Sequence, residues 1–169
     1  IGGYVEPKGP ILSTVEEYNP ETDTWTKKAD MPTPRWYHSS SVVGGKIYVV
    51  GGFPRNNAVL STVEEYDPAT DKWTKKADMP TARGAHSTSV SGGRIYAFGG
   101  TVLTTVEEYS PVTDTWIKKA DMPTGRLALT ASEVNGKIYV IGGIAGAVCS
   151  LKGLSTIEEY TPDGWQSGQ

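Results

Sequence analysis

An internal repeat constrains the fold of this chain more than any other feature. Four pairs of adjacent glycines lie 49, 48 and 43 residues apart, and each pair is followed by Glu-Glu-Tyr and then by a tryptophan. Three repeats also carry Met-Pro, with an arginine four positions after the methionine. The glycine pairs begin at Gly2, Gly51, Gly99 and Gly142, the tyrosines are Tyr18, Tyr66, Tyr109 and Tyr160, and the tryptophans are Trp25, Trp73, Trp116 and Trp165. Self-similarity at this period indicates a repeat architecture.

The variation in repeat length is confined to one segment. The tyrosine and the tryptophan are 7 residues apart in the first three repeats, and each methionine lies 20 residues before a glycine pair. The distance from the second glycine to the first glutamate, in contrast, is 13, 12, 7 and 15 residues. This pattern predicts rigid strands with one adjustable loop per repeat, and such loops lie on one face of a repeat protein.

The local signals within a repeat are those of β-strands. Residues 46–50 are β-branched and aromatic and are bounded by glycines. Gly44-Gly45 before them is typical of a tight hairpin turn. In the first whole repeat we predict strands near 39–43, 46–50, 62–66 and 73–77, the last of them polar like an outer edge strand. No segment has helical periodicity over ten residues.

These landmarks resemble those of the kelch-repeat family, over essentially the whole chain. The resemblance implies an all-β, kelch-type β-propeller of about 3.5 four-stranded antiparallel blades, an arc of a six- or seven-bladed ring with the first strand of each blade innermost. The predicted units are a partial blade at 1–30 (third and fourth strands), full blades at 31–78 and 79–121, and a blade at 122–169 that lacks most of its fourth strand. We expect the ends of the arc to be covered by remaining blades of a longer chain or by a second copy.

Composition narrows the choice of partners. The net charge is −3 and the isoelectric point about 5.4, which removes the electrostatic basis for binding nucleic acid. No apolar run approaches the roughly 18 residues of a membrane-spanning helix, so no membrane partner is predicted. Cys149 is the single cysteine and forms no metal-binding pattern. The sequence does not indicate a compartment.

The sequence contains little that indicates a catalytic or metal-binding site. The two glutamates of each pair point to opposite faces of a strand, so they form no acid–base dyad. His38 and His86 occupy equivalent positions in adjacent repeats and lack an obvious third ligand. Cys149 has no nearby histidine of the kind that the copper oxidases of the family use. We therefore predict no catalytic residue, no metal and no cofactor, and the sequence favours a non-enzymatic function.

Two groups of residues are candidates for partner binding. The resemblance places Arg35, Arg83 and Arg126 at the channel mouth, where arginine can clamp an acidic group; the alternative is a structural arginine that bridges loops or pairs with a blade glutamate. The second group lies in and beside the variable loop. It comprises Trp36, Tyr37, Phe53, Arg55 and Asn56.

Trp and Tyr beside Arg is a composition typical of interface hot spots, and it also suits stacking on sugars. Alternatively, Trp36 fills a gap between blades. The predicted function is a protein- or peptide-binding scaffold that uses its loop face. The alternatives are a carbohydrate-binding or sugar-modifying propeller with chemistry in a central pocket, and a purely architectural assembly unit. The sequence does not name the ligand.

Overall fold

A computed structural model describes residues 1–4, 9–55, 58–146, 152–161 and 164–166, and the regular structure in these ranges consists of β-strands alone. The strands are β1 (Gly3–Tyr4), β2 (Ile11–Leu12), β3 (Val15–Asn19), β4 (Thr24–Lys28), β5 (Ser39–Val43), β6 (Lys46–Val50), β7 (Val63–Asp67), β8 (Lys72–Lys76), β9 (Ser87–Ser91), β10 (Arg94–Phe98), β11 (Val106–Ser110), β12 (Thr115–Lys118), β13 (Thr130–Val134), β14 (Lys137–Ile141), β15 (Ile144–Ala145), β16 (Lys152–Gly153), β17 (Ile157–Thr161) and β18 (Gly164–Gln166).

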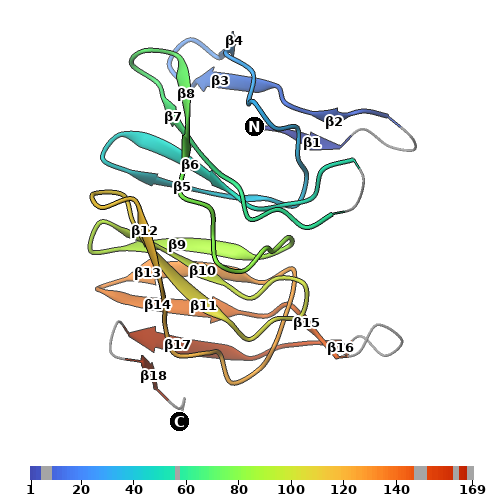
Figure 1. The fold of residues 1–169 in the computed structure, drawn as a ribbon, viewed down its shortest axis with the longest axis vertical. Helices are drawn as coiled ribbons and strands as arrows, with labels where there is room; N and C mark the ends of the chain where they lie inside the picture. The colour runs from blue at the N-terminus through green and yellow to red at the C-terminus, as the bar shows by residue number, and fades with distance from the viewer. Residues whose placement is uncertain (5–8, 56–57, 147–151, 162–163, 167–169) are drawn as a thin grey trace.

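The longer strands form three four-stranded antiparallel sheets and one antiparallel pair. The sheet orders are β5-β6-β7-β8, β9-β10-β11-β12 and β13-β14-β17-β18, and β3 pairs with β4. Figure 1 shows the pair at one end of the molecule and the sheet of β13 at the other. The all-β fold with four-stranded antiparallel sheets was predicted correctly, and the strands of the first sheet differ from the predicted ranges by at most one residue at any end.

Tight turns join the first two strands of each sheet. Gly44 and Gly45 have φ of 58° and 74°, and Asn135 and Gly136 have φ of 53° and 80°. Two consecutive residues with positive φ are what a two-residue hairpin turn of this hand requires, which explains why the repeats place Gly-Gly or Asn-Gly here. The turns set the register in which Ser39 faces Val50 and Thr130 faces Ile141.

The first strand of each sheet is innermost. Strand β9 lies against both β5 and β13. The Ser39 and Ser41 hydroxyls hydrogen-bond to Thr88 Oγ1, and the Ala131 N–H donates to Ser87 Oγ at 3.0 Å. Short hydroxyl side chains allow these strands to approach closely, so the sheets fan out from a shared inner edge as propeller blades do.

Adjacent blades bury apolar faces against each other. Tyr96 and Phe98 of β10 pack on Ile138 and Val140 of β14 and on Tyr160 of β17. Phe98, Ile138, Val140 and Tyr160 have no exposed surface. This burial is the main source of stability between blades.

A polar contact is repeated at the first two blade junctions. Trp73 Nε1–H donates to the Ala29 carbonyl of the preceding connection at 2.9 Å, and the Ala29 N–H donates to Asp71 Oδ1 at 2.9 Å. Asp71 also accepts from the Tyr66 hydroxyl at 2.6 Å. At the next junction Trp116, Asp114 and Tyr109 hold Ala77 in the same way. The fixed Tyr-to-Trp spacing therefore serves the junction between blades.

We predict that Asp114→Ala lowers the free energy of unfolding by about 2 kcal/mol, because it removes two charge-assisted hydrogen bonds. The same two bonds, with the Tyr109 hydroxyl first, hold the pKa of Asp114 below its usual value. The matched control is Asp23→Ala, since Asp23 accepts from Tyr18 at an exposed site and bonds to no described residue of a second blade. Urea denaturation of the two variants measures the difference. Equal losses would contradict a junction role for Asp114.

The two ends of the arc expose side chains whose equivalents elsewhere are buried or half-buried. Tyr18 and Trp25 are 42% and 67% exposed, whereas Tyr109 has no exposed surface. At the other end Ile141 and Ile157 are 42% and 61% exposed. The described part of the chain contains no helix with the length and apolar character needed to cross a membrane.

Candidate functional site

Two kinds of connection meet on one face of the molecule. One is the connection that enters a blade after Met-Pro, and the other is the loop that follows the glycine pair. Trp36 and Phe53 exchange backbone hydrogen bonds of 3.1 and 2.9 Å, and the Gly52 N–H donates to the Arg83 carbonyl at 2.9 Å. The fold thereby brings the predicted residues of 35–37 and 53–55 together, although the segments are far apart in sequence.

Trp36, Tyr37 and Phe53 form an aromatic cluster. The ring centroids of Trp36 and Tyr37 are 4.4 Å apart, and those of Trp36 and Phe53 are 5.8 Å apart. The Tyr37 ring meets Phe53 nearly edge-on at 6.5 Å and is 60% exposed. The cluster therefore presents a rigid aromatic surface whose outermost member is Tyr37.

The backbone at Tyr37 is common to three blades. Tyr37, Ala85 and Ala128 have φ of 49°, 53° and 52°. The Ala85 N–H donates to the Tyr37 carbonyl, and the Ala128 N–H donates to the Ala85 carbonyl, at 2.8 and 2.7 Å. The left-handed backbone conformation is therefore shared by three blades, together with the hydrogen bonds that join them. The tyrosine side chain at this position, in contrast, occurs in one of the three blades.

Gly84 makes room for the aromatic cluster. A Cβ atom added at Gly84 would overlap the Phe53 ring. The equivalent positions hold Trp36 and Leu127. The smallest residue therefore stands where the next blade meets the Phe53 ring, and its lack of a side chain leaves room for that ring.

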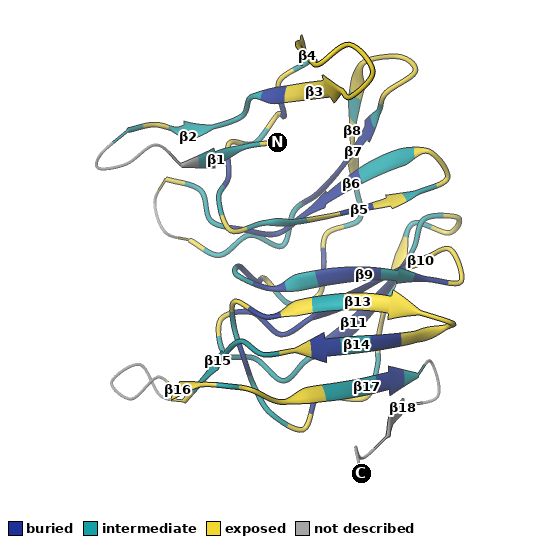
Figure 2. Ribbon diagram, turned by 180° about the vertical axis from the view of Figure 1, so that it is seen from behind, coloured by how far each residue is buried: buried dark blue, intermediate teal, exposed yellow. Residues whose placement is uncertain are grey.

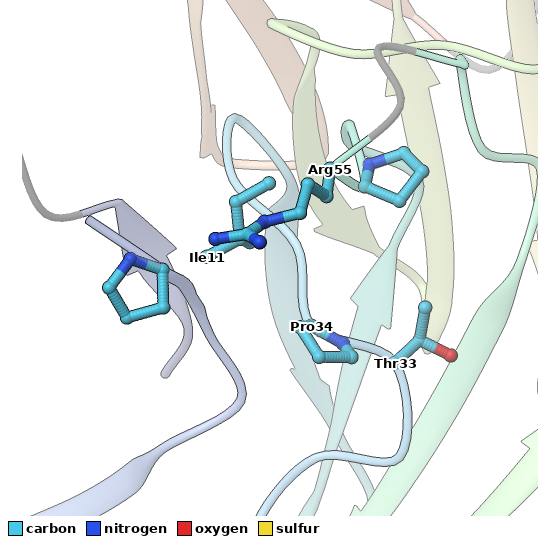
Figure 3. Close-up of a pocket in the computed structure, with 6 residues that line it drawn as sticks. Ile11, Thr33, Pro34 and Arg55 are labelled. Carbon is cyan, nitrogen blue, oxygen red and sulfur yellow. The ribbon is translucent and has the colours of Figure 1, made fainter. Parts of the chain in front are cut away.

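A cavity of about 420 Å³ lies beside this cluster. Its walls come from three segments, and Figure 3 shows the exposed Arg55 extending towards Ile11. The lining residues are Pro10, Ile11, Thr33, Pro34, Pro54 and Arg55. Sequence reasoning identified Arg55 but missed the prolines and Ile11. Asn56 lies outside the described residues.

The three candidate arginines are fully buried. Arg35 Nη1 donates to the carbonyls of Gly51 and Thr62 at 2.9 and 3.0 Å, and its Nη2 pairs with Glu64 at 2.8 Å. Burial lowers the pKa of Arg35, and the charge of Glu64 opposes that effect. The other two arginines are held by equivalent groups. Arg83 contacts Gly99, Thr105 and Glu107, and Arg126 contacts Gly142 and Glu158.

Each arginine therefore ties the entering connection to the glycine pair and to the third strand of its own blade. Their side chains expose no surface to a partner in this arrangement. We therefore leave Arg35, Arg83 and Arg126 out of the contact surface proposed below and assign them to the scaffold that supports it.

The second glutamate of each pair has a structural partner as well. Glu65 pairs with Lys46 at 2.8 Å, Glu108 with Arg94 at 2.8 Å and Glu159 with Lys137 at 2.8 Å. These contacts join the second and third strands of each blade. In three blades the second glutamate thus stabilises the contact between the second and third strands.

His86 is buried between blades, and His38 is half-buried at the equivalent place. Burial first, then the charge of Arg83, lowers the pKa of His86 to about 3, and burial together with Arg35 lowers that of His38 to about 4. Both side chains are thus neutral at pH 7. Within the described ranges, no group of three or more His, Cys, Asp or Glu side chains is arranged to hold a metal ion.

Blades that radiate from shared inner strands and present their loops on one face define a β-propeller arrangement. A family model described as the KLHDC2/KLHL20/DRC7 Kelch-repeats domain matches residues 1–143, and the Kelch motif matches residues 125–166. The chain therefore belongs to the kelch-repeat family.

Individual relatives are similar over single repeats. Human Kelch-like protein 23 is 40% identical over 52 residues, an F-box/kelch-repeat protein of Arabidopsis thaliana 44% over 52 residues, and the human Influenza virus NS1A-binding protein 49% over 51 residues. These matches cover 31%, 31% and 30% of this chain and 9%, 14% and 8% of the respective relatives. The similarity thus concerns the repeat rather than the whole of those proteins.

Proposed function

We propose that this chain is a protein-interaction module that binds a peptide segment of its partner on the loop face. The observation that carries the proposal is the aromatic cluster beside the cavity at Arg55, in which Tyr37 is exposed and Trp36 and Phe53 are half-buried. Aromatic residues and arginine are the residue types that most often dominate the binding energy of protein interfaces.

The shape and chemistry of the cavity support a peptide rather than a flat protein surface. Three prolines and Ile11 supply rigid apolar walls, and Arg55 supplies one cationic group at the opening. A site with apolar walls and a single charge favours a short segment with an apolar side chain and a neighbouring acidic group. Tyr37 extends the contact surface beyond the cavity.

The family supports the same reading. Among the similar proteins, one is named for binding NS1A of influenza virus. That name describes the relative. It supports testing protein ligands first for this chain.

We predict that Tyr37→Ala and Arg55→Ala each weaken binding of a selected peptide about tenfold without changing the melting temperature. About 1.4 kcal/mol of contact free energy corresponds to that factor. Tyr37→Ala should fold normally, because the equivalent Ala85 and Ala128 already adopt its backbone conformation. Peptides selected from a random display library provide the probe, and fluorescence anisotropy gives the affinity.

Val112→Ala is the control, since Val112 is 94% exposed on a turn between outer strands. It should bind like the unchanged chain. A library that yields no saturable ligand, or variants that bind as tightly as the control, would overturn the proposal. Binding to a glycan array through the same residues would favour the carbohydrate alternative.

A further inference from the structure

The turn between the third and fourth strands of a blade begins with a different residue in each repeat. The four residues, each followed by proline, are Asn19, Asp67, Ser110 and Thr161. The side chains of Asn19 and Asp67 each accept a hydrogen bond of 2.9 Å from the backbone N–H two residues further on, as is usual in such turns. The Ser110 hydroxyl forms no hydrogen bond with a described residue. Capping of the turn therefore does not account for the serine in the third repeat.

A basic residue of the second strand faces this turn position. Lys46 stands opposite Asp67 in the register of β6 and β7, and its Nζ lies 3.8 Å from the Asp67 carboxylate. Arg94 stands opposite Ser110 in the same register of β10 and β11. Arg94 pairs with Glu108 through Nη1 at 2.8 Å, and its side chain is 49% exposed. The third blade thus has the cation of this cross-strand pair and a neutral hydroxyl in place of the anion.

The backbone at Ser110 suits modification by a protein kinase. Ser110 is the last residue of β11, so its backbone is extended, and the proline that follows disfavours a helical conformation there. Proline-directed kinases act on an extended serine or threonine that precedes proline. Ser110 is half-buried, and the turn after it contains Val112, which is 94% exposed. Figure 2 shows how exposed this end of the blades is at the turn between β13 and β14.

Two other positions in the chain have threonine before proline. The Thr33 hydroxyl donates to the buried Glu64 at 2.7 Å, so it is already engaged in the scaffold. Thr161 precedes Pro162, which lies outside the described residues. Ser110 therefore combines the sequence, an unengaged hydroxyl and a cation on the facing strand.

We propose that Ser110 is a phosphorylation site for a proline-directed protein kinase and that its phosphate pairs with Arg94. In the transfer, Ser110 Oγ forms a bond to the γ-phosphorus of ATP, and the bond from that phosphorus to the β–γ bridging oxygen breaks. ADP leaves with the electron pair, and the hydroxyl proton passes to the catalytic base of the kinase. The product adds about −1.5 to −2 charges and three acceptor oxygens at pH 7.

The third blade can accommodate this charge. The guanidinium of Arg94 binds Glu108 through Nη1, and its fork of donors also suits a phosphate. Glu108 has a second cation, Lys119 at 3.2 Å, so Arg94 can be shared. The site is separate from the loop face, because Arg94 begins β10 and the loop face follows the other end of that strand. This proposal and the proposed function therefore stand independently.

The first test is phosphorylation of the folded chain with ATP and, in separate reactions, a mitogen-activated and a cyclin-dependent protein kinase. Peptide mass mapping locates the phosphate, and we expect it at Ser110. Ser110→Ala is the matched control, and it should fold normally because the hydroxyl makes no hydrogen bond with a described residue. A peptide with the sequence of residues 106–115 shows whether the kinases accept the sequence by itself.

Three results would overturn the phosphorylation site. In the first, the kinases modify the peptide and leave Ser110 of the folded chain unmodified. In the second, they modify neither. In the third, the phosphate of the folded chain lies only at Thr33 or Thr161.

The pairing with Arg94 is tested by urea denaturation of the chain before and after phosphorylation. We expect the phosphate to raise the equilibrium constant for folding about fivefold, the upper range for a pair that water can reach. In the Arg94→Gln variant the phosphate should give no such gain. Each variant is compared with its own unphosphorylated form, so the lost pair with Glu108 cancels. An equal gain in Arg94→Gln, or no gain in the unchanged chain, would contradict the pairing.

Discussion

Replacing Arg83 with alanine is expected to lower the free energy of unfolding by about 3–5 kcal/mol, the range for breaking one side of a buried ion pair. The variant would leave the Glu107 carboxylate, whose side chain is 3% exposed, without its cation, 2.6 Å away. It would also leave the carbonyls of Gly99 and Thr105 without the guanidinium donor. Urea denaturation at pH 7 measures the loss.

Arg126→Ala provides the comparison within the same chain. Arg126 is equally buried, but the side chain of its partner Glu158 is 18% exposed, so water can reach the carboxylate. The loss should therefore be smaller than for Arg83→Ala. If Arg83→Ala unfolded like the unchanged chain and instead lost affinity for a peptide, the arginine would be a partner contact and the scaffold role would be wrong.

The repeat predicted the strands because strand formation depends on local pattern. Residues 46–50 and their turn at Gly44-Gly45 carry their own period and turn chemistry, so strand ranges follow without knowledge of the neighbours. The blade class followed from the order of the landmarks. Both kinds of information lie within one repeat.

The burial of the arginines was not predictable in the same way. The separation between the arginine and its glutamate is 29, 24 and 32 residues in the three blades, because the variable loop lies between them. Because the spacing is not constant, the sequence does not reveal that the arginine and the glutamate form a pair. The burial of the arginine also depends on how the blades pack, which a local pattern does not show. The cavity was missed for a similar reason, since Pro10, Thr33 and Pro54 meet only after folding.

The aromatic residues at 36 and 37 were recognisable because they depart from the repeat. Gly84-Ala85 and Leu127-Ala128 stand at the same places, so the scaffold itself does not require Trp-Tyr there. The same reasoning applies to Phe53 and Arg55 in a loop of variable length. Departures from a repeat thus mark candidate binding residues, and agreement with it marks residues that hold the blades.

His86→Leu is expected to remove much of the loss of stability that the chain undergoes in mild acid. His86 is buried and neutral, with a pKa of about 3 against 6.5 for a free histidine. The unfolded chain therefore binds a proton below pH 6.5 that the folded chain does not bind until about pH 3. Stability from this group is complete above pH 6.5 and falls as the pH drops through this window, by roughly 2.5 kcal/mol between pH 6 and pH 4.

Leucine is the matched replacement, because Leu129 occupies the equivalent buried position in the following blade. Urea denaturation of both chains at pH 6 and pH 4 isolates the histidine, since the carboxylates titrate alike in each. His38→Leu should act in the same direction and less strongly, because its pKa of about 4 leaves a narrower window. Equal pH dependence in the His86→Leu variant and the unchanged chain would mean that His86 takes up its proton in the folded state, with the blades opening around it.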